Sequence, residues 1–198
     1  MSDLDPYRKK IDEADAEIVR LLNERLCAAR EIGRLKQEAN APVYVPAREQ
    51  QVFDKVMAMN EGPMSDAHLR AIYREIMSAA ISLELESSIA YLGPPTTFSH
   101  QAALSKFGQS LRYLSCDTIE QVFEEVEKEN AQYGVIPIEN SIQGGVTTTQ
   151  DRLTRTPLKI IAELYLPIHH CLMVQRGTEH PGQVYSHPQA LAQTVSIG

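Results

Sequence analysis

The chain has 198 residues, of which 43% are apolar, and it carries a net charge of −7 with a pI near 5.4. That length fits one large domain or two small ones, and the acidic balance argues against general nucleic-acid or membrane-surface binding. The three cysteines are widely spaced, the N-terminus is polar and no apolar run reaches membrane-spanning length. These features predict a soluble, cytoplasmic protein with no nucleic-acid or membrane partner, in which any basic site must be local.

The first part of the chain is predicted to be helical. Apolar residues recur with a seven-residue period along 5–39, which indicates one long amphipathic helix that starts at Asp5 and Pro6. Two further helices are predicted over 47–60 and from about 65 to 86. Three helices without strands make a poor closed core, so we expect the long helix to pack on a partner subunit in a homodimer.

Arg25 interrupts the apolar seam of the long helix, at a position where another aliphatic residue is expected. Lys36 lies three turns further along the same face, at roughly 16 Å, so the two long side chains can converge on one small anion. Arg8 lies roughly 42 Å from Lys36 and can serve that site only from an antiparallel partner helix. The alternatives are a buried ion pair with a glutamate for Arg25 and a solvated flank for Arg8 and Lys36.

The pattern changes after residue 87, where short apolar runs alternate with helical segments. This alternation predicts a mostly parallel sheet with helices on its faces. Asp117 is expected to cap a helix in a capping box with Glu120. The expected strands cover 89–92, 111–116, 133–138 and 183–185, the expected helices cover 98–107, 150–154 and a stretch from 188, and 158–174 is expected to be mostly extended.

Four polar loops fall at the predicted carboxyl ends of strands: GPPTTFSH (93–100), SCDT (115–118), PIENSIQGG (137–145) and YSHPQ (185–189). Ligands bind at this edge in open parallel sheets, and helix amino termini there can receive a carboxylate. The alternative is that the Ser, Thr and Asp side chains only cap helices. The paired Gly144 and Gly145 indicate a backbone that comes close to a ligand. No histidine spacing supports a metal site.

Several blocks carry a resemblance to known families. YRKKID, LLNERL, REIGRLK, YVPAREQ and YREIMSAAISLE resemble the all-helical chorismate mutases, which are intertwined helical dimers. AYLGPPTTFSHQAA, YGVIPIENSIQGGV and YSHPQALAQ resemble prephenate dehydratase. In this order they resemble the bifunctional chorismate mutase–prephenate dehydratase family of phenylalanine biosynthesis. The resemblance implies a multidomain α and α/β fold, with a three-helix mutase domain over 1–86, a periplasmic-binding-protein-like dehydratase domain over 88–198, and no cofactor.

The mutase resemblance implies roles for individual residues in binding and rearranging chorismate. Arg25, with Arg8 of the other subunit, would bind the substrate carboxylates, and Lys36 would hydrogen-bond the ether oxygen whose bond breaks. Arg48 and Glu49 would hold the ring hydroxyl region, and Lys36, Glu84 and Arg25 form the expected catalytic group. Many relatives carry a polar residue where this chain has Val45 and a serine where it has Ala80.

Glu84 stands where the family has a Gln or Glu that faces the ether oxygen. A carboxyl group must be protonated to donate a hydrogen bond there, so mutase activity is expected to favour acidic pH. Chorismate rearranges without a protein nucleophile, so catalysis must come from holding a reactive conformer and stabilising charge on that oxygen.

The dehydratase resemblance implies a cleft for prephenate. The family's catalytic Thr-Arg-Phe motif comes later in the domain than Gly198, so the polypeptide looks like a fragment that is expected to lack dehydratase activity. The residues implied in the cleft are Thr97, Ser99, Glu139, Asn140, Ser141, Ser186, Gln189 and Gln193.

Two other functions remain open. One is a dimeric, non-enzymatic sensor of small carboxylates, in which Arg25 would be a structural ion pair. The other is a monofunctional chorismate mutase with a vestigial dehydratase tail.

Overall fold

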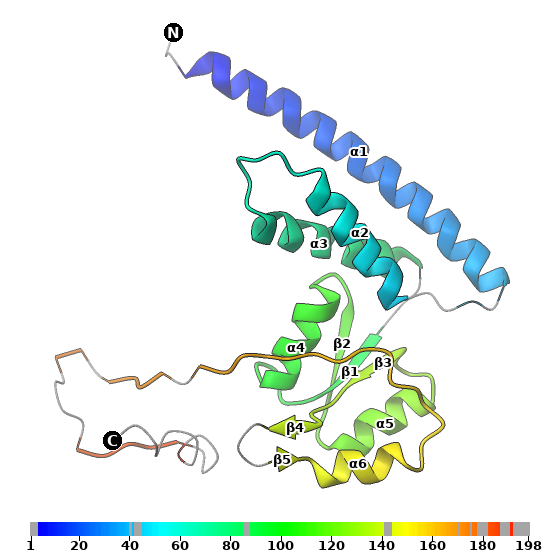
Figure 1. Cartoon of the computed structure of the whole chain (residues 1–198), viewed down its shortest axis with the longest axis vertical. Helices are drawn as coiled ribbons and strands as arrows, with labels where there is room; N and C mark the ends of the chain where they lie inside the picture. Colours follow the sequence, from blue (N-terminus) through cyan, green and yellow to red (C-terminus); the bar gives the residue numbers. More distant parts are fainter. Residues whose placement is uncertain are drawn as a thin grey trace.

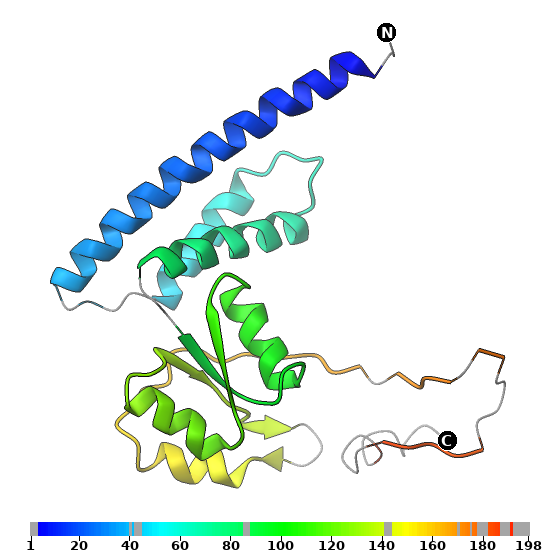
Figure 2. The ribbon, with the colours of Figure 1, turned by 180° about the vertical axis from the view of Figure 1, so that it is seen from behind.

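The structure is a computed structural model that consists of a helical part, an α/β part and an extended tail (Figure 1). The helical part contains α1 to α3, and the α/β part begins at β1 and ends with α6. After α6 the chain follows an extended path that leaves the α/β part in both views (Figure 2). The structure describes residues 4–39, 41, 45–84, 88–140, 144–169, 171–174, 176–177, 182–186 and 191.

Helix α1 spans Asp5–Glu38 and has a proline in its first turn, as predicted. It packs against α3, while its amino-terminal half extends beyond the other two helices (Figure 1). Only Gly33 of this helix is buried. The seam residues that stay exposed are Leu4, Tyr7, Ile11, Ile18, Leu21, Ile32 and Leu35. The predicted apolar seam is therefore present, and the chain's own described residues leave most of it uncovered.

Helices α2 (Pro46–Ala58) and α3 (Asp66–Glu84) lie side by side under α1. Phe53 and Val56 of α2 and Ala80 of α3 are buried, because they lie on the apolar face of each helix. The Ser65 hydroxyl accepts a hydrogen bond from the His68 amide at 3.3 Å and so caps α3. The predicted helices are confirmed, although α2 ends two residues earlier than expected.

The central strand of the α/β part is β1 (Ser88–Leu92). It pairs in parallel with β2 (Arg112–Cys116) on one side and β3 (Tyr133–Val135) on the other, which confirms the predicted parallel sheet. Helices α4 (Phe98–Phe107) and α5 (Ile119–Glu127) supply the crossovers.

Side chains of β1 alternate between two cores because successive residues of a strand point to opposite faces. Ile89 and Tyr91 pack with Phe107 of α4, and Ala90 packs with Val122 of α5. The helices therefore cover both faces of the sheet, as predicted.

Helix α3 joins the helical part to the α/β part at the turn that follows α4. The Ser110 amide donates to the Ser78 hydroxyl at 3.1 Å, and the Gln109 amide donates to the Glu75 carboxylate at 3.0 Å. Gly108 lies in this turn with a φ of +76°, and a Cβ there would come within 2.5 Å of the Ser78 Cβ. The close approach and the left-handed backbone both require glycine.

The helix cap that was predicted at Asp117 is wrong by one residue. Thr118 adopts the extended cap conformation, and its hydroxyl accepts from the Gln121 amide at 3.1 Å. The Gln121 side chain in turn accepts from the Asp117 amide at 2.8 Å. The capping pair is therefore Thr118 and Gln121, in place of Asp117 and Glu120.

The sheet differs from expectation after β3, which ends at Val135, three residues earlier than predicted. A two-residue hairpin of β4 (Glu139–Asn140) and β5 (Gly144–Gly145) follows, and then α6 (Thr147–Leu153). Residues 183–185 were predicted to be a strand, but the described stretch 182–186 has no sheet partner. That prediction is wrong, and the helix expected from residue 188 begins outside the described residues.

The Ile89→Ala substitution tests whether β1 is the core of the α/β part. Ile89 is fully buried, so we expect a loss of about 3 kcal/mol in the free energy of unfolding, because a cavity replaces its side chain. Ile160→Ala is the matched control, since Ile160 is 73% exposed, and it should change stability by less than about 0.5 kcal/mol. Urea unfolding measures both, and equal stabilities for the two variants would contradict this account of the core.

Candidate functional site

The three cations predicted on the long helix all lie on α1. Arg8 is exposed near the amino terminus and makes a 3.5 Å ion pair with Asp5. Lys36 lies in the last turn and is half-buried. Because α1 is one unbroken helix, Arg8 and Lys36 of the same chain remain about 42 Å apart. One chain therefore brings Arg25 and Lys36 to the same stretch of helix and leaves Arg8 remote from them.

Arg25 is half-buried, and its Nη1 atom is buried without a hydrogen-bond partner among the described residues. A buried guanidinium nitrogen without a partner is energetically costly, and such groups are usually satisfied by a carboxylate or a phosphate. The ion pair with a glutamate that was the alternative for Arg25 is not found in the described part of the chain. The neighbouring Glu17 and Glu24 bond instead to Arg20.

The first turn of α2 carries two more predicted residues. Arg48 is exposed and donates to the Gln51 side chain at 3.3 Å. Glu49 makes a 2.5 Å ion pair with Lys106 of α4, and the side chains of Lys106 and Glu49 are only 19% and 13% exposed. Glu49 therefore faces the α/β part in this structure. Glu84 ends α3, and its side chain lies outside the described residues.

Val45 and Ala80 are the two positions where the chain has an apolar residue in place of the polar residue of many relatives. Val45 is the residue before α2, in an extended conformation, and it is 38% exposed. Ala80 is buried on α3. Neither can supply a hydrogen bond to a ligand from its side chain.

The parallel order of β2, β1 and β3 brings the loops that follow these strands to one edge of the sheet. The Gly93 amide donates to the Cys116 carbonyl at 2.8 Å and so ties the first two loops together. Thr97 uses its hydroxyl structurally, because it donates to the Leu92 carbonyl at 3.0 Å and accepts from the His100 amide at 3.3 Å. Ser99 lies in the first turn of α4 and is half-buried.

The third loop contains the β4–β5 hairpin. Exposed Glu139 pairs with Gly145, and half-buried Asn140 pairs with Gly144. Gly144 has a φ of +74°, so this hairpin gives the paired glycines a structural use.

Of the remaining predicted residues, Ser186 is the one that the structure describes. Ser186 is exposed in the tail, in a described stretch without sheet pairing. Ser141, Gln189 and Gln193 lie outside the described residues.

Burial controls the protonation of two groups near the loops. Burial, followed by the charge of Glu75, raises the pKa of Tyr113, so its hydroxyl stays protonated and donates to the Gly108 carbonyl. Burial also raises the pKa of the Cys116 thiol, which disfavours a thiolate nucleophile at the end of β2.

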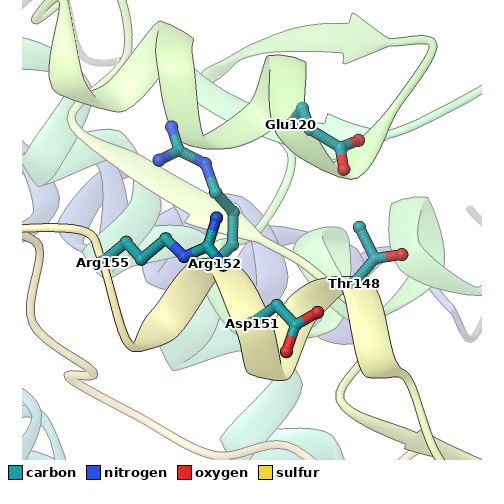
Figure 3. Close-up of a pocket in the computed structure, with 5 residues that line it drawn as sticks. All are labelled: Glu120, Thr148, Asp151, Arg152 and Arg155. Atoms are coloured by element: carbon teal, nitrogen blue, oxygen red, sulfur yellow. The ribbon is translucent and has the colours of Figure 1, made fainter.

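A cavity of about 320 Å³ lies between α5 and α6, and its described lining residues include none of those predicted to bind a substrate (Figure 3). Arg152 reaches from α6 to Glu127 of α5 at 2.9 Å, and its guanidinium lies 5.2 Å from the centre of the Phe123 ring. These contacts hold the two helices together. The residues that line the cavity are Glu120, Thr148, Asp151, Arg152 and Arg155.

A second cavity, of about 150 Å³, lies where α2, α3 and α4 meet. Its basic residues Arg70 and Arg74 were missed by the sequence analysis, although two arginines four residues apart on one helix face were a readable signal. The described lining residues are Glu49, Gln50, Phe53, Arg70, Arg74, Ser105 and Lys106.

Within the described ranges, no group of three or more His, Cys, Asp or Glu side chains is placed to hold a metal ion. No helix among these residues is long and apolar enough to cross a membrane.

Residues 89–197 match the prephenate dehydratase family, and residues 7–85 match chorismate mutase type II. A bifunctional chorismate mutase/prephenate dehydratase of Aquifex aeolicus is 47% identical over 201 residues, which cover 99% of this chain and 56% of that relative. A protein of the same name from Neisseria gonorrhoeae is 44% identical over 190 residues, covering 95% of this chain and 52% of the relative.

Among solved structures, a chorismate mutase of Thermus thermophilus (form II) is 38% identical. The aligned residues cover 42% of this chain and 94% of the Thermus chain, with a TM-score of 0.41. The chain spans about half the length of the curated relatives it matches. Its two matched segments and these relatives show that the chain belongs to the chorismate mutase/prephenate dehydratase family.

Proposed function

We propose that the helical part, over 1–86, rearranges chorismate to prephenate, and that the part over 88–198 contributes to a prephenate dehydratase of phenylalanine biosynthesis. The observation that carries the proposal is the buried Nη1 of Arg25, which has no partner among the described residues. A substrate carboxylate supplies the partner that this nitrogen lacks. The family membership supplies the identity of the substrate.

The chemistry requires positioning and charge, without a protein nucleophile or a cofactor. Arg25 binds a carboxylate of chorismate, and Lys36, from the same helix, donates a hydrogen bond to the ether oxygen on which negative charge develops. Glu84 contributes a second donor at that oxygen. Arg48 and Glu49 bind the ring hydroxyl region, which requires Glu49 to turn from Lys106 or to use its other oxygen.

The active site is completed by a second copy of the chain in an intertwined homodimer. Two observations support this assembly. Most of the apolar seam of α1 is exposed in one chain, with Ile11 at 58% and Ile18 at 52%. Arg8 is about 42 Å from Lys36 along α1, so an antiparallel α1 of the partner has to bring Arg8 to the site.

In the second part, the sheet edge contributes to a cleft for prephenate in a periplasmic-binding-protein-like domain. Loss of the ring hydroxyl with carbon dioxide needs a proton donor at the hydroxyl and binding groups for two carboxylates. Ser99, Glu139 and Asn140 offer polar side chains near that edge. Thr97 contributes through the helix it caps, because its hydroxyl already bonds to Leu92 and His100.

The Arg25→Ala substitution separates the mutase from a carboxylate sensor. We expect chorismate turnover to fall by about 10²- to 10³-fold, since a charged contact to the substrate is lost. Arg34→Ala is the matched control, because the ion pairs that Arg34 makes with described residues are exposed ones, to Glu31 and Glu38 on the same helix. A chorismate-disappearance assay measures both. Full turnover by Arg25→Ala, or no turnover by the unsubstituted chain, would refute the proposed mutase.

The role of Glu84 predicts a pH dependence. Its carboxyl must carry a proton to donate to the ether oxygen, so turnover should rise as the pH falls from about 8 to about 5. Glu84→Gln should keep activity and lose this dependence, because an amide donates at every pH in that range. A pH–rate profile of the unsubstituted chain that is flat across this range would contradict the proposed role.

A further inference from the structure

The cavity at the junction of α2, α3 and α4 concentrates positive charge in an acidic protein. Three cationic side chains line it, Arg70 and Arg74 from α3 and Lys106 from α4. Glu49 is the carboxylate among the described lining residues, and it is paired with Lys106 at 2.5 Å. The two arginines are therefore not balanced by the described lining residues.

Neither arginine has an ion pair or hydrogen bond to another described residue, although both are half-buried. They lie one helical turn apart, a spacing at which like charges repel and destabilise the helix by a few tenths of a kcal/mol. An anion bound between the two guanidinium groups reduces their repulsion, because it attracts both of them.

The ring of Phe53 contacts one of the two arginines and helps to hold it in place. The Arg70 guanidinium lies 4.5 Å from the centre of the Phe53 ring, and Phe53 is itself buried. This cation–π contact is not a hydrogen bond, so it leaves guanidinium N–H donors available to a ligand. Planar donors of this kind match carboxylate and phosphate oxygens in pairs. Ser105 and Gln50 also line the cavity, and their side chains donate to the Ala102 carbonyl at 2.9 Å and to Asp54 at 2.7 Å.

We propose that this cavity binds a small dianion bearing carboxylate or phosphate groups, through Arg70 and Arg74. The cavity shares Glu49 with the proposed chorismate site, but neither Arg25 nor Lys36, the cations of that site on α1, is among its described lining residues. Its volume of about 150 Å³ suits a molecule the size of malonate or inorganic phosphate.

Calorimetric titration with malonate and, separately, inorganic phosphate tests the proposal, at an ionic strength held constant with chloride. The unsubstituted chain should bind at least one of the two anions saturably. Arg74→Gln should weaken that binding by about tenfold or more, and Arg70→Gln provides a second test if the first variant does not fold. Lys55→Gln is the matched control, because it removes one positive charge from an exposed position on α2 and should change affinity by less than about twofold.

Arg25→Gln distinguishes this site from the proposed chorismate site and should leave anion binding at the cavity intact. The anion that binds more tightly shows whether a dicarboxylate or a phosphate is the better occupant. Tighter binding of either anion supports the site if Arg74→Gln weakens that binding while Lys55→Gln and Arg25→Gln do not. The proposal is overturned if no saturable binding occurs, if Lys55→Gln weakens binding as much as Arg74→Gln, or if only Arg25→Gln abolishes it.

Discussion

The feature on which the account of the helical part depends is Arg25, which has a buried nitrogen without a partner among the described residues, on a helix whose apolar seam is largely uncovered. Water satisfies a guanidinium well, so placing one of its nitrogens out of reach of water must be compensated by an anion. The exposed aliphatic side chains of α1 impose a second requirement, because a surface of this kind is stable when another apolar surface covers it. In our proposal a substrate meets the first requirement and a second copy of the chain meets the other.

The α/β part is organised around β1, which is buried on both faces and paired on both edges. This central position fixes the loops after β1, β2 and β3 at one edge, and the α3 contact at Gly108 attaches the sheet to the helical part. The ion pair of Glu49 with Lys106 strengthens the same junction. A side chain expected at the mutase site thus contacts the second part of the chain.

Periodicity predicted the regular elements well. The seven-residue repeat located α1 to within one residue, and the apolar runs located β1 and α4. The β4–β5 hairpin was missed because Glu-Asn and Gly-Gly carry no apolar alternation. The cap at Thr118 depends on the backbone conformation of one residue, which composition does not specify. The pairing of Glu49 with Lys106, 57 residues apart, arises only from tertiary packing, as does the cavity with Arg70 and Arg74.

Subunit complementation tests the central claim most directly, because it asks whether Arg25 and Arg8 of different chains form one site. A heterodimer of an Arg25→Ala chain and an Arg8→Ala chain, isolated with two affinity tags, retains one site with both arginines. We expect each parent homodimer to lose turnover by about 10²-fold or more, and the heterodimer to regain about half of the unsubstituted turnover of chorismate. A heterodimer as inactive as its parents would contradict the shared site.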